Sequence, residues 1–172
     1  MLGWNALRRW GPAANCRWEP HPEPAADHPG EGVMHIAVDL ATAVVETYQE
    51  TRRIDPYTGS PRATSWTPTR PLRLLNLTDD WCLRNGASAS LTSAPQSTCR
   101  AWARAIHTAW PDLDGLWTQS ILTGRANITL WAPAAETFPA LPAFSERLAD
   151  DLLWDRLDQL ARRYSNAGYR LN

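Results

Sequence analysis

The segment GVMHIAVDLATAVVETYQETR, residues 32–52, decides the predicted fold. Its first part, residues 32–37, is a short apolar run that predicts a β-strand. Asp39 follows where a helix would begin, and its carboxylate can accept hydrogen bonds from the first free backbone N–H groups. We therefore expect a helix from Asp39 through about Arg53.

Glu46 lies in the middle of this predicted helix. Helical spacing places it on a polar side with Thr42, Gln49 and Arg53, opposite an apolar side of Leu40, Val44 and Tyr48. Periodicity alone therefore predicts that Glu46 is a solvated surface charge.

The remaining chain mixes irregular segments with short periodic ones. Residues 1–31, 55–71 and 132–144 are rich in proline and are expected to be loops or arms; a loop as long as the second is often functional. Strands are expected at 72–79, 115–120 and 127–131, and helices at 97–110 and from about 150 to 165. Strands and helices do not alternate regularly, so the expected fold class is α+β, as a single domain spanning residues 1–172.

Two of the predicted helices have definite ends and apolar sides. Ser97 or Thr98 would cap the helix at 97–110, and Pro111 would stop it. Its apolar side is predicted to hold Ala101, Ala105, Ile106 and Trp110. The last helix repeats apolar residues at helical spacing, namely Leu153, Leu157, Leu160, Ala161 and Tyr164. Asn166 and Gly168 can end that helix.

Composition limits the class of function. The 172 residues carry a net charge of -1, and the pI is near 6.4, so bulk electrostatics do not indicate nucleic acid as a partner. The three cysteines have no paired spacing that would indicate a disulfide framework. We find no apolar run typical of a signal peptide or a membrane span, and we expect a cytoplasmic protein.

Several of the ten tryptophans lie beside polar segments and suit a pocket for a flat ligand: Trp18, Trp66 and Trp117.

Common catalytic and phosphate-binding motifs such as GxGxxG, GxxxxGK[ST], HExxH and CxxC do not occur. Four residues of metal-binding types lie near the N-terminus: Cys16, His21, His28 and His35. Their spacing fits no zinc finger and no helical ligand pair, so we predict no metal site. Cys99 and His107 lie eight residues apart on one predicted helix, beyond direct contact, and are expected to be a buried thiol and a surface histidine.

Four segments carry motifs that are weak one by one: CRWEPHP (16–22), GVMHIAVDLATAVVETYQ (32–49), RAWARAIHTAWPDLDGLWTQS (100–120) and NITLW (127–131). In this order and spacing they resemble the RES-domain family, over roughly residues 8–132. That family is named for an arginine, a glutamate and a serine, which match Arg17, Glu46 and Ser120 here.

The resemblance implies both a fold and an activity. RES domains have an ADP-ribosyltransferase-like fold of small mixed sheets flanked by helices, and they act as toxins of bacterial toxin–antitoxin pairs with a helix-turn-helix (Xre-type) antitoxin as partner. They use NAD as substrate, without metal, and cleave its nicotinamide–ribose bond by hydrolysis or phosphorolysis. Neither a membrane nor direct nucleic-acid contact is implied. Two alternatives stay open: a protein ADP-ribosyltransferase with the same site, and a catalytically inactive interaction protein.

The resemblance also implies roles for particular residues. Glu46 would stabilise the cationic sugar formed when the bond breaks, and Arg17 would pair with the pyrophosphate. Trp18 would stack on the nicotinamide or wall it off. His35, at a position where the family commonly has tyrosine, would do the same or bond a ribose hydroxyl. Ser120 would hydrogen-bond the ribose or the carboxamide. We expect Glu46 to face a cleft formed by the strand at 32–37, the segment around Arg17 and the end of the strand leading to Ser120, against the prediction from periodicity.

Overall fold

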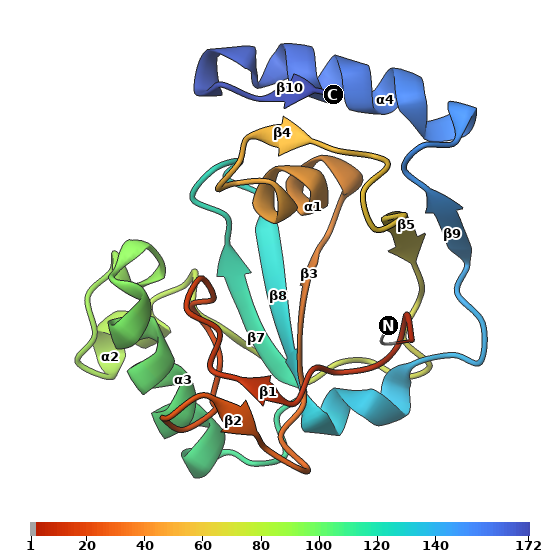
Figure 1. The fold of residues 1–172 in the computed structure, drawn as a ribbon. Helices are drawn as coiled ribbons and strands as arrows, with labels where there is room; N and C mark the ends of the chain where they lie inside the picture. Colours follow the sequence, from red (N-terminus) through yellow and green to blue (C-terminus); the bar gives the residue numbers. More distant parts are fainter. Residues whose placement is uncertain (1–2) are drawn as a thin grey trace. The chain divides into compact units, whose positions relative to one another are not determined.

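The structure is a computed structural model that describes residues 3–172 of the chain. Its helices and small sheets form an α+β fold, which confirms the predicted class (Figure 1). The chain divides into two compact units: the first holds residues 3–38 and 68–138, and the second holds residues 39–67 and 139–172. Within the described residues, we find no helix that is both long and apolar enough to cross a membrane.

The first unit is built on a four-stranded mixed sheet, drawn in Figure 1 with β8 between β3 and β7. Its strands in spatial order are β3 (Val33–Ala37), β8 (Ala126–Trp131), β7 (Gly115–Gln119) and β6 (Leu74–Asn76). β8 is antiparallel to both of its neighbours, and β6 is parallel to β7. Three of the predicted strands are confirmed within about a residue, and the strand expected at 72–79 is shorter.

The pairing of β7 with β8 requires glycine at Gly115. The residue has φ 151°, and a Cβ atom there would lie 1.9 Å from the carbonyl oxygen of Thr129. Any other residue would force the two strands apart at the point where β7 begins.

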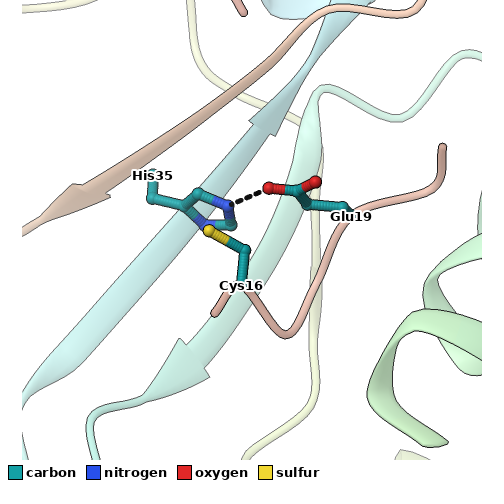
Figure 2. A group of neighbouring side chains, drawn as sticks. All are labelled: Cys16, Glu19 and His35. Atoms are coloured by element: carbon teal, nitrogen blue, oxygen red, sulfur yellow. Dashed lines mark hydrogen bonds and ion pairs between the residues drawn. The ribbon is translucent and has the colours of Figure 1, made fainter. Parts of the chain in front are cut away.

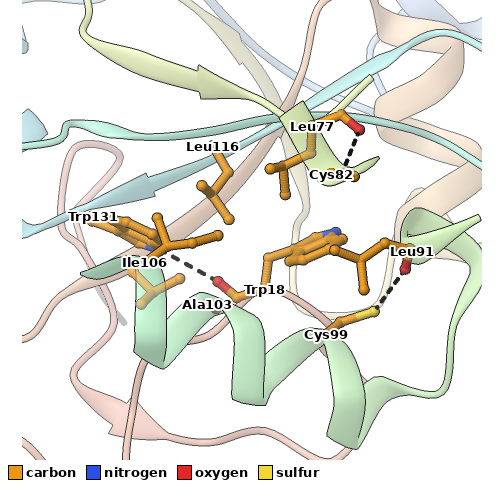
Figure 3. Packing of buried hydrophobic residues seen from close by; sticks show 10 residues of the cluster. Trp18, Leu77, Cys82, Leu91, Cys99, Ala103, Ile106, Leu116 and Trp131 are labelled. Carbon is orange, nitrogen blue, oxygen red and sulfur yellow. Dashed lines mark hydrogen bonds between the residues drawn. The ribbon is translucent and has the colours of Figure 1, made fainter. Parts of the chain in front are cut away.

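Helices and turns around this sheet enclose the core of the first unit. The elements are α2 (Trp81–Arg84), α3 (Gln96–Ala109) and the 3-10 helices η1 (Leu91–Ser93) and η2 (Ala132–Thr137). The core contains buried side chains from the sheet, α3 and the N-terminal segment, among them Trp18, Leu77, Cys99, Ala103, Ile106, Leu116 and Trp131 (Figure 3).

The predicted apolar side of α3 is wrong except for Ile106. The helix buries Cys99, Ala103 and Ile106, whereas Ala105 and Trp110 are exposed. Cysteine behaves as a small apolar residue, and its spacing to Ala103 and Ile106 defines a consistent helical face. The predicted serine or threonine cap is also wrong: Pro95 occupies the cap position, and no side chain caps the helix.

The N-terminal segment is mostly irregular, as expected. Two short strands, β1 (Trp10–Gly11) and β2 (Ala26–Asp27), pair antiparallel within it. Such two-residue strands carry no readable periodicity, which explains why the sequence did not predict them.

The second unit consists of two helices and two small sheets. It contains α1 (Leu40–Thr47), β4 (Arg53–Ile54), β5 (Arg62–Ser65), β9 (Phe144–Arg147), α4 (Asp151–Arg163), η3 (Ser165–Ala167) and β10 (Arg170–Leu171). β5 pairs antiparallel with β9, and β4 pairs parallel with β10. Its core comprises Val44, Val45, Ile54, Leu148, Leu153, Leu157, Ala161 and Tyr169.

Both helices of this unit start as predicted, but α1 is shorter than expected. The Thr42 N–H donates to Asp39 Oδ1 at 2.8 Å, which confirms the predicted cap. α1 ends at Thr47 rather than near Arg53, because the chain turns through Arg52 with φ 54° before it enters β4. α4 buries Leu153, Leu157 and Ala161 on its predicted face.

The segments expected to be loops also hold regular structure. β5 lies within residues 55–71, and β9 begins at the end of the predicted arm. Their sequences, RATS and FSER, do not alternate apolar with polar residues, so the pairing of the two strands could not be seen locally.

We predict that Asp114→Ala lowers the free energy of unfolding by about 2 kcal/mol, because it removes the buried carboxylate that accepts from Arg70 and from the Arg73 N–H, and the partial exposure of Arg70 reduces the loss. The Asp114 carboxylate is fully buried and accepts from both terminal nitrogens of Arg70, at 2.6 and 2.8 Å, and from the Arg73 N–H at 2.7 Å. Denaturant unfolding monitored by circular dichroism measures the change.

The control for this prediction is Asp158→Ala. Asp158 accepts from Arg162 at an equally short 2.8 Å, but both side chains are largely exposed. That variant should lose no more than ~0.5 kcal/mol, and equal losses in the two variants would contradict the burial argument.

Candidate functional site

Arg17 is a half-buried arginine without a protein partner. Its Nε atom is buried and has no hydrogen-bond acceptor, and no ion pair of its guanidinium group is found within residues 3–172. A buried donor that is left unsatisfied costs about 1–3 kcal/mol, and more when it is charged. Such a group is well suited to an anion supplied by a ligand.

Trp18, the next residue, lies in the core rather than at an open surface. Its side chain is 5% exposed, and its carbonyl oxygen accepts a 3.4 Å hydrogen bond from Trp131 Nε1. Figure 3 shows its ring among core side chains from α3 and the sheet. The geometry therefore gives no support to stacking of Trp18 on a ligand, and the residue acts in packing.

Glu19 is a fully buried carboxylate with several donors around it. It pairs with Arg8 and accepts from the Ala13 N–H at 2.7 Å, while His35 Nε2 lies 3.4 Å from its Oε1. Burial raises the pKa of this carboxyl group, but hydrogen bonds from His35 and Ala13 and the charge of Arg8 outweigh it and bring the pKa down to about 2. Glu19 is therefore charged across the physiological pH range.

His35, on β3, has both ring nitrogens engaged. Nδ1 shares a 3.1 Å hydrogen bond with Thr129 Oγ1 on β8, and Nε2 faces Glu19 (Figure 2). The side chain remains 37% exposed. These two contacts fix the orientation of the ring. Only a face and a carbon edge of the ring are then open to a ligand, because both nitrogens are engaged.

The four residues of metal-binding types separate into two pairs. His21 and His28 stack on one another, with centroids 5.1 Å apart. Cys16 instead lies beside Glu19 and His35, and ligand atoms of these three residues all fall within 4.8 Å of one another. Burial, followed by the charge of Glu19, raises the pKa of the Cys16 thiol to about 12, so the free thiol is a poor nucleophile.

Ser120 is buried and organises the loop between β7 and β8. Its Oγ accepts from the N–H groups of Leu122 and Thr123, at 3.2 and 3.1 Å, and its backbone pairs with Arg125. An acceptor for its hydroxyl proton is not found in the described part of the chain. The proton is therefore free to donate to a ligand.

Glu46 belongs to the second unit and is half-buried, near the end of α1. Thr42, one helical turn earlier on the side predicted to be solvated, is fully buried. Burial raises the pKa of the Tyr169 hydroxyl and the Glu46 carboxylate adds to the effect, whereas Arg52 opposes it. The side of α1 that carries Glu46 is thus not a purely solvated surface, contrary to the prediction from periodicity.

Most of the predicted site residues, Arg17, Trp18, His35 and Ser120, lie in the first unit, and Glu46 lies in the second. The sequence analysis missed Glu19, Arg8 and Thr129. Glu19 stands in an irregular segment, where no periodicity separates a buried carboxylate from a solvated one. Its position directly after an arginine and a tryptophan was the only available signal.

Comparison with known proteins agrees with the sequence motifs. A family model of the RES domain matches residues 4–155, which is most of the chain. The chain therefore belongs to the RES-domain family. No curated protein and no solved structure matches it significantly. Membership supports, at the level of the family, an NAD-related function of the toxin–antitoxin type.

We predict that the charge of Glu19 stabilises the fold and that the contribution is lost in acid. The pKa falls from an ordinary 4.5 to about 2, so the contribution is complete above about pH 4.5 and disappears as the pH drops through 2. It should amount to about 2–3 kcal/mol after allowance for solvent screening. Denaturant unfolding at a series of pH values measures it.

Glu19→Gln should therefore unfold more easily than the parent protein at neutral pH, and the two curves should converge near pH 2. Glu50→Gln is the control, because Glu50 is exposed and its loss should leave the pH profile unchanged. A constant difference between Glu19→Gln and the parent at every pH would contradict the assignment.

Proposed function

We propose that this RES-domain protein cleaves the nicotinamide–ribose bond of NAD and passes the ADP-ribosyl group to water or phosphate. Family membership supports an NAD-related role, and the observation that carries the proposal is the unpartnered, half-buried guanidinium of Arg17. A guanidinium group pairs with phosphate oxygens in a bidentate fork, which suits the pyrophosphate of a dinucleotide.

The proposed reaction depends more on electrostatic stabilisation of the cationic ribose than on proton transfer. Departure of nicotinamide leaves an oxocarbenium-like ribose, as in glycoside cleavage. Glu46 is our candidate for the carboxylate that stabilises this charge. At ~4 Å and an effective dielectric constant near 20, opposite unit charges attract by about 4 kcal/mol before desolvation is counted.

Ser120 and His35 would orient the substrate in this proposal. The free hydroxyl proton of Ser120 can donate to a ribose or carboxamide oxygen. His35, with both nitrogens engaged, would contribute a ring surface rather than act as a general base. Trp18 has no direct role here, because it is buried in the core.

Two other functions compete with this proposal. A protein ADP-ribosyltransferase would use the same groups and differ only in the acceptor of the ADP-ribosyl group. A catalytically inactive RES protein would keep the fold and bind its partner. Purified protein incubated with NAD, with and without phosphate, separates them: free or phosphorylated ADP-ribose supports our proposal, labelled protein supports transfer, and unchanged NAD supports the inactive alternative.

We predict that Glu46→Gln lowers NAD turnover at least ~100-fold, equivalent to about 2.7 kcal/mol of transition-state stabilisation. Glutamine keeps the size and much of the hydrogen bonding of glutamate but removes its charge. The free energy of unfolding should change by no more than about 1 kcal/mol. An NAD-consumption assay and thermal melting of the same preparation measure both effects.

Glu50→Gln serves as the matched control, since Glu50 lies four residues further along and is exposed. It should keep the parental rate. A Glu46→Gln protein that consumes NAD at close to the parental rate would refute the role given to Glu46.

We further propose that a small helix-turn-helix protein neutralises this enzyme, since uncontrolled loss of NAD would kill the cell that makes it. We predict that expression of the RES protein alone arrests growth and that co-expression with the product of an adjacent helix-turn-helix gene restores it. Growth curves and co-purification test the pairing. Equal arrest with and without the neighbour, or failure to form a complex, would contradict it.

A further inference from the structure

We propose that Cys16, Glu19 and His35 form a binding site for one zinc ion, separate in chemistry from the proposed NAD reaction. The three side chains offer a sulfur, a carboxylate oxygen and an imidazole nitrogen within 4.8 Å of one another. Ligand atoms around a tetrahedral zinc ion lie about 3.3–3.8 Å apart, given bonds of about 2.0–2.3 Å. His35 Nε2 and Glu19 Oε1 already lie 3.4 Å apart.

His35 is held in the orientation that a ligand needs. In the free protein, Nε2–H donates to Glu19 and Nδ1 accepts from Thr129 Oγ1. When zinc binds, the proton would move to Nδ1, which can then donate to Thr129 Oγ1, and Nε2 would become free to bind the ion. Metal-binding histidines almost always donate their other ring N–H to such an acceptor, which fixes the ring and raises its basicity.

Glu19 is also held in place before any ion binds. The Ala13 N–H donates to its Oε2 at 2.7 Å, and the otherwise unpartnered Nδ1 of the buried His21 lies 3.5 Å from the same oxygen. The carboxylate is therefore charged and fixed, so little further ordering is required when it becomes a ligand.

Cys16 supplies the group that selects the metal. Zinc binds the thiolate form of cysteine, so the Cys16 thiol releases its proton to solvent as the zinc–sulfur bond forms and the ion gives up water. A thiolate with an imidazole and a carboxylate favours zinc over magnesium or calcium. Because His35 is 37% exposed, the fourth position of the ion is open to water.

Arg8 opposes the ion, which makes the proposal easy to test. Its guanidinium pairs with Glu19 and places a positive charge beside the site. Arg8→Gln removes the competing cation but leaves all three proposed ligands, and we expect it to bind zinc more tightly than the parent protein does. A cluster that only holds the N-terminal segment together would bind no zinc in either protein.

The experiment is a titration of the reduced, full-length protein with Co²⁺ as a spectroscopic probe, followed by displacement with Zn²⁺. We expect one ion per chain, a thiolate-to-cobalt charge-transfer band, and visible bands of four-coordinate cobalt that disappear when zinc is added. Zinc affinity is then measured by competition with a chromophoric chelator.

Cys16→Ser should abolish the charge-transfer band, and both Cys16→Ser and His35→Gln should weaken zinc binding at least ~100-fold, beyond the 10–100-fold typical of losing an outer partner. The controls Cys82→Ala and His107→Gln change the same residue types outside the cluster and should bind as the parent does. Circular dichroism confirms folding of each variant, and His35→Gln, at an exposed side chain, serves if Cys16→Ser does not fold. Absence of a band in the parent protein, or a band that persists in Cys16→Ser, would overturn the proposal.

Discussion

The buried charge of Glu19 is the constraint on which the N-terminal part of the first unit depends. An isolated carboxylate cannot remain charged inside a protein without partners. Here Arg8 and the Ala13 N–H, from the same N-terminal segment, and His35, from β3, provide them. The carboxylate therefore ties an irregular segment to β3. Loss of the charge would leave Arg8 without its counter-charge and would weaken the hydrogen bond from the Ala13 N–H.

The same constraint fixes the residues next to Glu19. Trp18 packs in the core, and Arg17, its neighbour, is only half-buried and retains an unpartnered guanidinium. A free loop would satisfy such a group with water at no cost. A segment held by a buried ion pair and a buried tryptophan is less free to move, so Arg17 keeps a buried Nε without an acceptor. The interactions that hold Arg17 in place come from its neighbours Trp18 and Glu19, to which the proposed NAD reaction gives no direct role.

A helix or strand could be predicted from the sequence when its own residues carry a clear apolar pattern. β3, β7 and β8 carry apolar runs long enough to be recognised, and α4 shows its apolar face in the spacing of Leu153 and Leu157. β5 and β9 are polar, and only their pairing across the chain defines them. The face of α3 was assigned wrongly because Cys99 was left out of it, although the sequence analysis expected a buried thiol there and Cys99 is fully buried.

The candidate site was predictable only through the order of its motifs. Arg17, Glu46 and Ser120 are ordinary residues one by one, and the chain matches the RES family because they occur in sequence with the surrounding segments. Glu19 stands inside one of those segments but is not one of the three residues for which the family is named, and its importance is visible only when its partners are brought together in space. The prediction from helical periodicity also failed at Glu46. Such a prediction assumes that the polar side of a helix is solvated, whereas Thr42 on that side is fully buried.

The states of the charged groups also limit what chemistry the first unit can perform. Glu19 is saturated with donors, and its pKa of about 2 makes it a weak base. The Cys16 thiol, with a pKa raised to about 12, is protonated, and both nitrogens of His35 are engaged. None of these three groups is poised as a general base or a nucleophile. Cleavage of NAD places little demand on such groups, because nicotinamide departs as a neutral molecule and needs no proton. In the proposed reaction, Arg17 would bind an anion, Ser120 would donate a hydrogen bond and Glu46 would stabilise positive charge, and none of these roles depends on proton transfer.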